Sequence, residues 1–154
     1  MMITEIEQET LDIDWFFTDG KYIGFMASGG GKLPNSVAES KEEHQVLVNY
    51  FRNLPEVSDV LVNLELDSLL IKTFGSGADE RYLENYISMT KKGLYSYDKT
   101  VLSNFLDPHY HLVAIPKEPL KLENLPQDIL DIISKTRFLN HIENFLEINI
   151  LEIN

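Results

Sequence analysis

The stretch Trp15–Met26, WFFTDGKYIGFM, carries the strongest fold signal in the chain. Aromatic and β-branched side chains lie on both sides of an Asp-Gly pair at positions 19 and 20. This arrangement is typical of two short strands joined by a tight turn, because Asp and Gly tolerate the backbone angles that such a turn requires. We therefore predict a β-hairpin here, and with it a sheet at the centre of the fold.

A glycine-rich segment follows the hairpin, with the sequence SGGG at 28–31 and then Lys32, Leu33 and Pro34. Three adjacent glycines lose too much backbone entropy to lie inside a helix or strand, so we expect a loop. Exposed amides in such a loop can hold phosphate. A phosphate-binding P-loop, however, needs GxxxxGK followed by Ser or Thr, and this spacing is absent. We therefore interpret 28–34 as a structural connection.

Three segments have the signals of helices. Ser40 and Glu43 form a capping-box pattern before a helical run that ends at Pro55. A second run begins at Asp79 and ends at Gly93. A third, over 126–133, begins with a proline, which the first turn of a helix tolerates well.

The remaining regular segments favour strands. They comprise a Val- and Leu-rich run at 60–73, two runs at 94–97 and 110–115, and the partly alternating tail at 144–154. Strands and helices do not alternate regularly along the chain, which argues against a parallel α/β architecture. We predict a single α+β domain over 1–154, with a mainly antiparallel sheet packed with about three helices.

Composition places the chain among compact globular proteins. Its 154 residues are 44% hydrophobic and include no cysteine, which excludes disulfides and thiolate zinc sites. Residues 1–14 carry five acids, and no base precedes Lys21, the reverse of a targeting segment. The apolar runs are far shorter than the ~20 residues that span a bilayer. We expect a cytoplasmic protein with no membrane contact.

The chain has a large excess of negative charge, with 25 acidic against 13 basic residues and a net charge of −12. Such a field disfavours the phosphate backbone of nucleic acids and favours a cationic partner. The acids are densest in the first third of the sequence. We predict that a partner-binding patch forms from Asp12, Asp14, Asp19, Glu39, Glu42 and Glu43.

Residues for catalysis are hard to find. The sequence has no Gly-x-Ser-x-Gly elbow and no cysteine nucleophile, so we expect neither an enzyme nor a cofactor. Asp107, His109 and His111 are the best metal-like cluster, because histidines two apart on a strand point to the same side. A further ligand is not visible, and exposed histidines at a strand start fit the pattern as well. A small metal-dependent enzyme using this trio remains the alternative.

Several patterns occur together in an order that resembles a known class of proteins. They are Trp15-Phe16, Gly20, the glycine loop, the motif GLYSYD at 93–98 and the strand at 110–116. From about residue 14 to 134, the chain resembles bacterial immunity-type proteins of polymorphic-toxin and contact-dependent competition loci. The resemblance implies a noncatalytic inhibitor that binds and neutralises a cognate toxin, which the charge suggests is basic. A self-associating adaptor domain is a further alternative.

Overall fold

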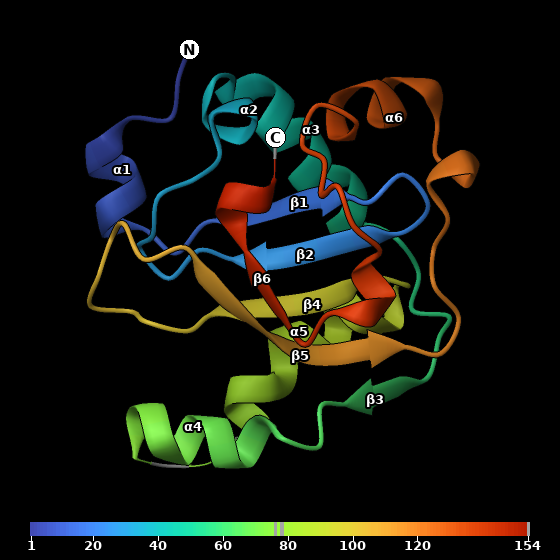
Figure 1. Ribbon diagram of the computed structural model, residues 1–154. Coiled ribbons are helices and arrows are strands. Elements are labelled where there is room, and N and C mark those ends of the chain that lie inside the picture. The colour runs from blue at the N-terminus through green and yellow to red at the C-terminus, as the bar shows by residue number, and fades with distance from the viewer. Residues whose placement is uncertain (76, 78, 154) are drawn as a thin grey trace.

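The computed structural model describes residues 1–75, 77 and 79–153, and it has an α+β architecture built on one mixed sheet (Figure 1). The strand order is β1-β2-β4-β5-β3, and β6 pairs with β5 beside β3. The strands are β1 (Asp14–Thr18), β2 (Ile23–Ala27), β3 (Val60–Val62), β4 (Tyr95–Lys99), β5 (His109–Pro116) and β6 (Glu147–Asn149). The helices are α1 (Glu5–Thr10), α2 (Asn35–Ala38), α3 (Lys41–Arg52), α4 (Leu66–Phe74), α5 (Glu80–Lys91) and α6 (Gln127–Ile133).

The predicted hairpin is confirmed. β1 and β2 pair antiparallel, and Phe17 lies opposite Gly24. Asp19 shapes the turn, because its Oδ1 accepts hydrogen bonds of 2.8 Å from the backbone N–H groups of Lys21 and Tyr22. Gly20 has a φ of 96°, which an L side chain rarely adopts. The sequence signal at Asp-Gly therefore has a direct structural cause.

The sheet is mixed rather than antiparallel throughout. Four of the described strand pairings are antiparallel, as expected, but β2 and β4 run parallel, with Gly24 beside Tyr95. A parallel pair needs a long crossover between its strands. Here the crossover contains α2 to α5 and also β3, which crosses to the far edge of the sheet.

Both faces of the sheet are covered, and alternation along β1 divides the core in two. Phe16 faces the side covered by α3, α5 and α6, whereas Trp15 and Phe17 face the opposite side. On that opposite side the sheet packs against the amino-terminal segments and the carboxy-terminal tail, which crosses the sheet in Figure 1. The largest core side chains on both sides are aromatic.

The three predicted helices are confirmed as α3, α5 and α6, but the expectation of about three helices is wrong because α1, α2 and α4 also form. The Ser40 hydroxyl accepts the Glu43 N–H at 3.1 Å. The complete capping box lies instead at Thr4 and Glu7, at the start of α1. The missed α1 and α2 are only six and four residues long, which leaves little room for a hydrophobic period.

The predicted strand at 60–73 is wrong beyond its first three residues. β3 ends at Val62, and the Oδ1 atom of Asn63 accepts the Glu65 N–H at 3.1 Å, which turns the chain. α4 then begins at Leu66, which lies one helical turn before Leu70; both are buried. The tail is also less regular than predicted, since β6 has three residues and a single 3₁₀ turn follows at Ile150–Glu152.

Candidate functional site

The glycine loop packs around a buried lysine. A Cβ atom at Gly31 would lie 2.7 Å from Cδ of Lys99, and one at Gly29 would lie 3.5 Å from Lys99 Cβ. The loop amides have internal acceptors, since Gly31 N–H donates to the Ser28 carbonyl at 2.8 Å and Gly29 N–H to Oδ1 of Asp12 at 2.9 Å. The lack of a side chain at Gly31 thus serves packing against Lys99, whereas a Cβ at Gly29 would lie 2.6 Å from Cδ2 of Leu102.

Three of the acids predicted to bind a partner hold the fold together. Asp12 accepts the Gly29 N–H, and Oδ2 of Asp19 accepts the Ile142 N–H at 2.9 Å. Asp14 forms an ion pair with Arg52. Burial raises the pKa of the Asp14 carboxyl, and the Arg52 guanidinium opposes this shift.

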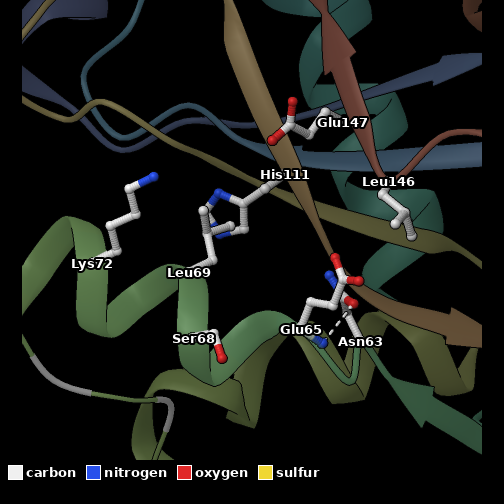
Figure 2. A pocket seen from close by; sticks show the side chains of 8 residues that line it. All are labelled: Asn63, Glu65, Ser68, Leu69, Lys72, His111, Leu146 and Glu147. Atoms are coloured by element: carbon white, nitrogen blue, oxygen red, sulfur yellow. Dashed lines mark hydrogen bonds between the residues drawn. The ribbon is translucent and has the colours of Figure 1, made fainter.

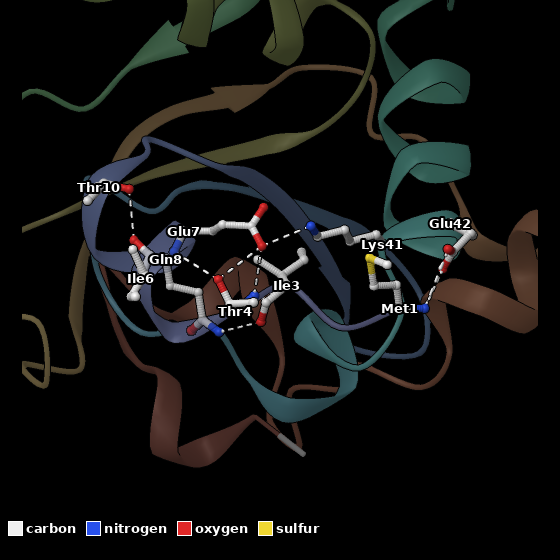
Figure 3. Close-up of polar contacts among 9 residues, drawn as sticks. All are labelled: Met1, Ile3, Thr4, Ile6, Glu7, Gln8, Thr10, Lys41 and Glu42. Carbon is white, nitrogen blue, oxygen red and sulfur yellow. Dashed lines mark hydrogen bonds and ion pairs between the residues drawn. The ribbon is translucent and has the colours of Figure 1, made fainter.

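The acids at the start of α3 also have internal partners. Glu42 pairs with the amino-terminal ammonium of Met1 at 3.1 Å (Figure 3). Glu43 pairs with Lys135 at 2.9 Å. Glu39 is exposed at the end of α2. Five of the six predicted acids therefore have a structural role, so their replacement alters the fold as well as the charge.

The structure gives the two predicted metal-ligand histidines different environments. His109 is exposed, with Nδ1 3.0 Å from Oδ1 of Asp107, whereas His111 is buried, with Nδ1 3.0 Å from the Thr100 hydroxyl. Across residues 1–75, 77 and 79–153, no three His, Cys, Asp or Glu side chains are grouped to hold a metal. A third ligand for the pair is therefore not present in this part of the chain.

Sequence reasoning missed a hollow of about 430 Å³ between α4 and the strands β5 and β6, which we call the α4 hollow (Figure 2). His111 projects into it from β5, opposite Glu147 of β6. Leu69 and Lys72 reach it from α4. Its complete lining is Asn63, Glu65, Ser68, Leu69, Lys72, His111, Leu146 and Glu147.

The α4 hollow lies where two short strands share one edge of β5. β3 pairs with the end of β5 and β6 with its beginning. Asn63 bridges the gap, because its Nδ2 donates to the Leu112 carbonyl at 2.8 Å and its backbone N–H donates to the Val113 carbonyl at 2.9 Å. The same side chain thus ends β3 and closes one side of the hollow.

Large apolar side chains are exposed in the segments that border the α4 hollow. Leu64, just before α4, is 99% exposed, and Leu146, at the wall, is 51% exposed. Ile71 of α4 is 56% exposed as well. Glu65 and Glu147 add negative charge and Lys72 one positive charge. Apolar groups rimmed by charge are typical of protein interaction surfaces.

A buried polar cluster lies behind His111. The Tyr82 hydroxyl, from α5, donates to Oδ2 of Asp98 at 2.7 Å and lies 3.5 Å from Nε2 of His111. Asp98 of β4 is the register partner of His111 on β5. Burial raises the pKa of Asp98 to about 6 and lowers the pKa of His111 to about 4. Near neutral pH the imidazole is therefore uncharged and the carboxyl is mostly ionised.

A second hollow, of about 410 Å³, opens on the other side of Tyr82, and we call it the Asp98 hollow. It brings Asp98 together with Asp12, which precedes β1. Its lining consists of Asp12, Ala27, Gly29, Tyr82, Asn85, Tyr86, Asp98 and Leu102. Two carboxylates and two phenols gather here, which suits recognition of positive charge.

A signal for this cluster exists in the sequence. In YSYDK at 95–99, period-two alternation separates Tyr95 and Tyr97 from Ser96 and Asp98. Tyr82 and Tyr86 are four apart on a helix and so share one face. The sequence does not show that this face of α5 packs against β4, and this packing brings the residues together.

Known proteins add nothing to these observations. In the described residues, no helix has both the length and the apolar character needed to cross a bilayer. No family model, curated protein or solved structure matches the chain.

Proposed function

We propose that the chain is an immunity-like protein that binds and neutralises a cognate, basic bacterial toxin by contact, without turnover of its own. The observation that carries this proposal is the exposed apolar rim of the α4 hollow. Leu146 lines this concave site and is 51% exposed, and Leu64, which directly precedes the lining residue Glu65, is 99% exposed. Glu65 and Glu147 add negative charge to the same lining. Such a combination fits a protein partner better than a small polar substrate.

The charge of the whole chain supports a basic partner. A net charge of −12 raises the local concentration of a cationic protein and speeds its encounter. The two glutamates at the α4 hollow place part of that charge beside the apolar contact surface. Apolar contact then supplies affinity and the field supplies association rate.

The proposal is tested with the product of the neighbouring gene. Co-expression should restore growth of cells that make the toxin, and the two proteins should co-purify. Leu64→Lys places a positive charge on a side chain that is 99% exposed, so folding should be unaffected and binding should weaken about tenfold or more. Leu139→Lys, at a leucine that is 66% exposed in the segment after α6, is the matched control.

Two outcomes contradict the proposal at different levels. If the wild-type chain neither binds nor neutralises any neighbouring product, the function is wrong. If the wild-type chain binds and Leu64→Lys binds equally well, the α4 hollow is not the contact surface.

The charge contribution needs variants that leave internal contacts intact. Asp14 is unsuitable because its charge pairs with Arg52, and Asp12 and Asp19 do not line the α4 hollow. Glu65→Gln and Glu147→Gln change exposed side chains at the α4 hollow instead. Each should slow association, and added salt should reduce the difference from wild type. Association rates measured by stopped flow that do not depend on salt would exclude electrostatic steering.

A further inference from the structure

Asp98 is a buried carboxylate without a cation. Its side chain lies at the wall of the Asp98 hollow and the residue is 7% exposed. Its carboxylate accepts hydrogen bonds from the Tyr82 hydroxyl, at 2.7 Å, and from Tyr86 and the Lys99 backbone, and in the described part of the chain it takes part in no ion pair. Buried carboxylates are ordinarily paired with a positive charge or a metal, because their desolvation is costly.

The positive groups closest to Asp98 along the sheet do not neutralise it. Lys99 follows it in β4, so its side chain points to the opposite face, where Nζ donates to the Asp107 carbonyl and lies 6.0 Å from the centre of the Tyr110 ring. His111, opposite Asp98 on β5, is kept uncharged by burial at neutral pH. The chain itself thus leaves the negative charge of Asp98 open toward the hollow.

A second carboxylate faces the same hollow from another segment. Asp12 is held there by the Gly29 N–H, which binds Oδ1 at 2.9 Å. Burial raises the pKa of Asp98, and the negative charge of Asp12 raises it further. Two like charges converging on one concave site produce a strong negative potential, which a bound cation relieves.

The remaining wall suits the flat or rounded end of a cationic side chain. Tyr82 and Tyr86 have ring centres 5.4 Å apart, tilted by 35°. Aromatic rings attract ammonium and guanidinium groups, and the exposed Asn85 beside them offers an amide oxygen. The volume of about 410 Å³ admits a side chain but no folded element.

We propose that the Asp98 hollow binds the cationic end of an arginine or lysine side chain, held by the carboxylates of Asp98 and Asp12 beside the paired rings of Tyr82 and Tyr86. That this side chain belongs to a toxin rests on the function proposed above. Guanidinium fits best, because its planar donors pair with two carboxylates at once.

The test uses methylguanidinium as the probe and methylurea as its uncharged analogue of similar shape. Each is titrated into the ¹⁵N-labelled protein at pH 7.5, to roughly 20 mM, far below denaturing concentrations. Methylguanidinium should produce saturable shift changes at Gly29, Tyr82, Asn85 and Asp98, and methylurea should not. A titration with Mg²⁺ and Ca²⁺ serves as the metal arm, and saturation at the same amides by a metal alone would overturn the proposal.

Three variants locate the effect. Asp98→Asn and Asp12→Asn remove one charge each but keep an oxygen for the Tyr82 hydroxyl and the Gly29 N–H, and each should weaken methylguanidinium binding about tenfold. Glu84→Gln removes one charge from an exposed position of α5 and should bind as wild type does. Equal weakening in all three variants would reduce the effect to net charge and overturn the site.

The outcomes separate this inference from the function. If the wild-type chain and Asp98→Asn neutralise the toxin equally well, the proposed function stands and the proposed site is wrong. If methylguanidinium binds saturably but no toxin is neutralised, the proposed site stands and the proposed function is wrong. Shift changes that follow methylurea and methylguanidinium alike would overturn the cation site whatever the toxin result.

Discussion

Gly24 of β2 lies against the ring of Phe17, its register partner on β1, and this contact leaves no room for a side chain. A Cβ atom there would lie 2.1 Å from Cε1 of Phe17. Phe17 is fully buried and cannot move aside without disturbing the core. We expect Gly24→Ala to lower the free energy of unfolding by about 2 kcal/mol, as overpacked cores do.

A double-mutant cycle with Phe17→Leu measures this contact. The smaller side chain should be destabilising alone but should recover part of the Gly24→Ala loss when the two changes are combined. Urea denaturation gives all four free energies. Strictly additive effects would show that Gly24 is required for a reason other than the Phe17 ring.

Asp98 and His111 should give opposite pH dependences of stability. The pKa of Asp98 is raised from 3.8 to about 6, so the folded state holds its proton more tightly and stability from this group falls as pH rises from about 4 to 6. The pKa of His111 is lowered from 6.5 to about 4, so its contribution is lost as pH falls through the same range. Asp12, Tyr82 and Tyr86 face Asp98. Tyr82, Thr100 and the charged groups of the α4 hollow, Glu65, Lys72 and Glu147, face His111.

Variants separate the two contributions. As pH rises from 4 to 7, the free energy of unfolding of Asp98→Asn should increase by about 3 kcal/mol relative to that of wild type. This is the energy that corresponds to a shift of about two pKa units. His111→Gln should change in the opposite sense, gaining relative stability as pH falls. Urea denaturation at several pH values checks both, and parallel pH profiles for wild type and either variant would contradict the assignment.

At the level of elements, α1 is held to the body by the buried amide of Gln8 and by an ion pair of Glu7 with Lys41 of α3 (Figure 3). Nε2 of Gln8 donates to the Ile3 carbonyl at 3.1 Å, and its Oε1 accepts the Leu33 N–H at 2.9 Å. Gln8→Ala leaves both backbone groups without this partner, so we expect a loss of about 2 kcal/mol in the free energy of unfolding.

The matched control is Gln45→Ala, because Gln45 is an exposed amide of α3 that bonds only the side chain of Asn49, at 2.9 Å. Its loss should change the free energy of unfolding by less than about 0.5 kcal/mol. Hydrogen exchange should show faster exchange across α1 in Gln8→Ala. Equal losses in the two variants would contradict the anchoring role of Gln8.

Elements with their own local signals were predictable. Asp19-Gly20, the Asp79 cap and Gly93 mark turns and ends that depend on neighbouring residues alone, and the structure confirms each. α4 was not predictable from alternation, because Leu64 and Leu66 suggested a strand while Asn63 turns the chain through a bond to the distant Leu112. The secondary structure of short elements is determined by such long-range contacts rather than by the spacing of their own apolar residues.

The candidate site was less predictable than the fold. Charge density indicated Asp12, Asp14 and Asp19, but it does not report that their oxygens already bind backbone groups or Arg52. The two hollows depend on where α4 and α5 pack against the sheet. Sequence supplies residue types for a site, whereas tertiary packing decides which of them remain available.

For the whole molecule, the excess of negative charge should make stability depend on salt. The described ion pairs with Lys, Arg or the amino terminus join four acids to a cation, and the net charge of the chain is −12. Screening of this repulsion should raise the melting temperature by a few degrees between 10 and 300 mM NaCl. Potassium chloride should act alike, since screening does not distinguish the two salts. A melting temperature that falls with salt would show that the ion pairs dominate.

The parallel pairing of β2 with β4 has a consequence for synthesis on the ribosome. Tyr95 enters the chain roughly seventy positions after its partner Gly24. The hairpin of β1 and β2 therefore leaves the exit tunnel with the outer edge of β2 unpaired. This edge stays unpaired until the four helices α2 to α5 and then β4 have been translated. Non-local pairing of this kind slows folding and exposes an edge to other nascent chains. Chaperone dependence during translation is the expected cost of placing the two strands side by side.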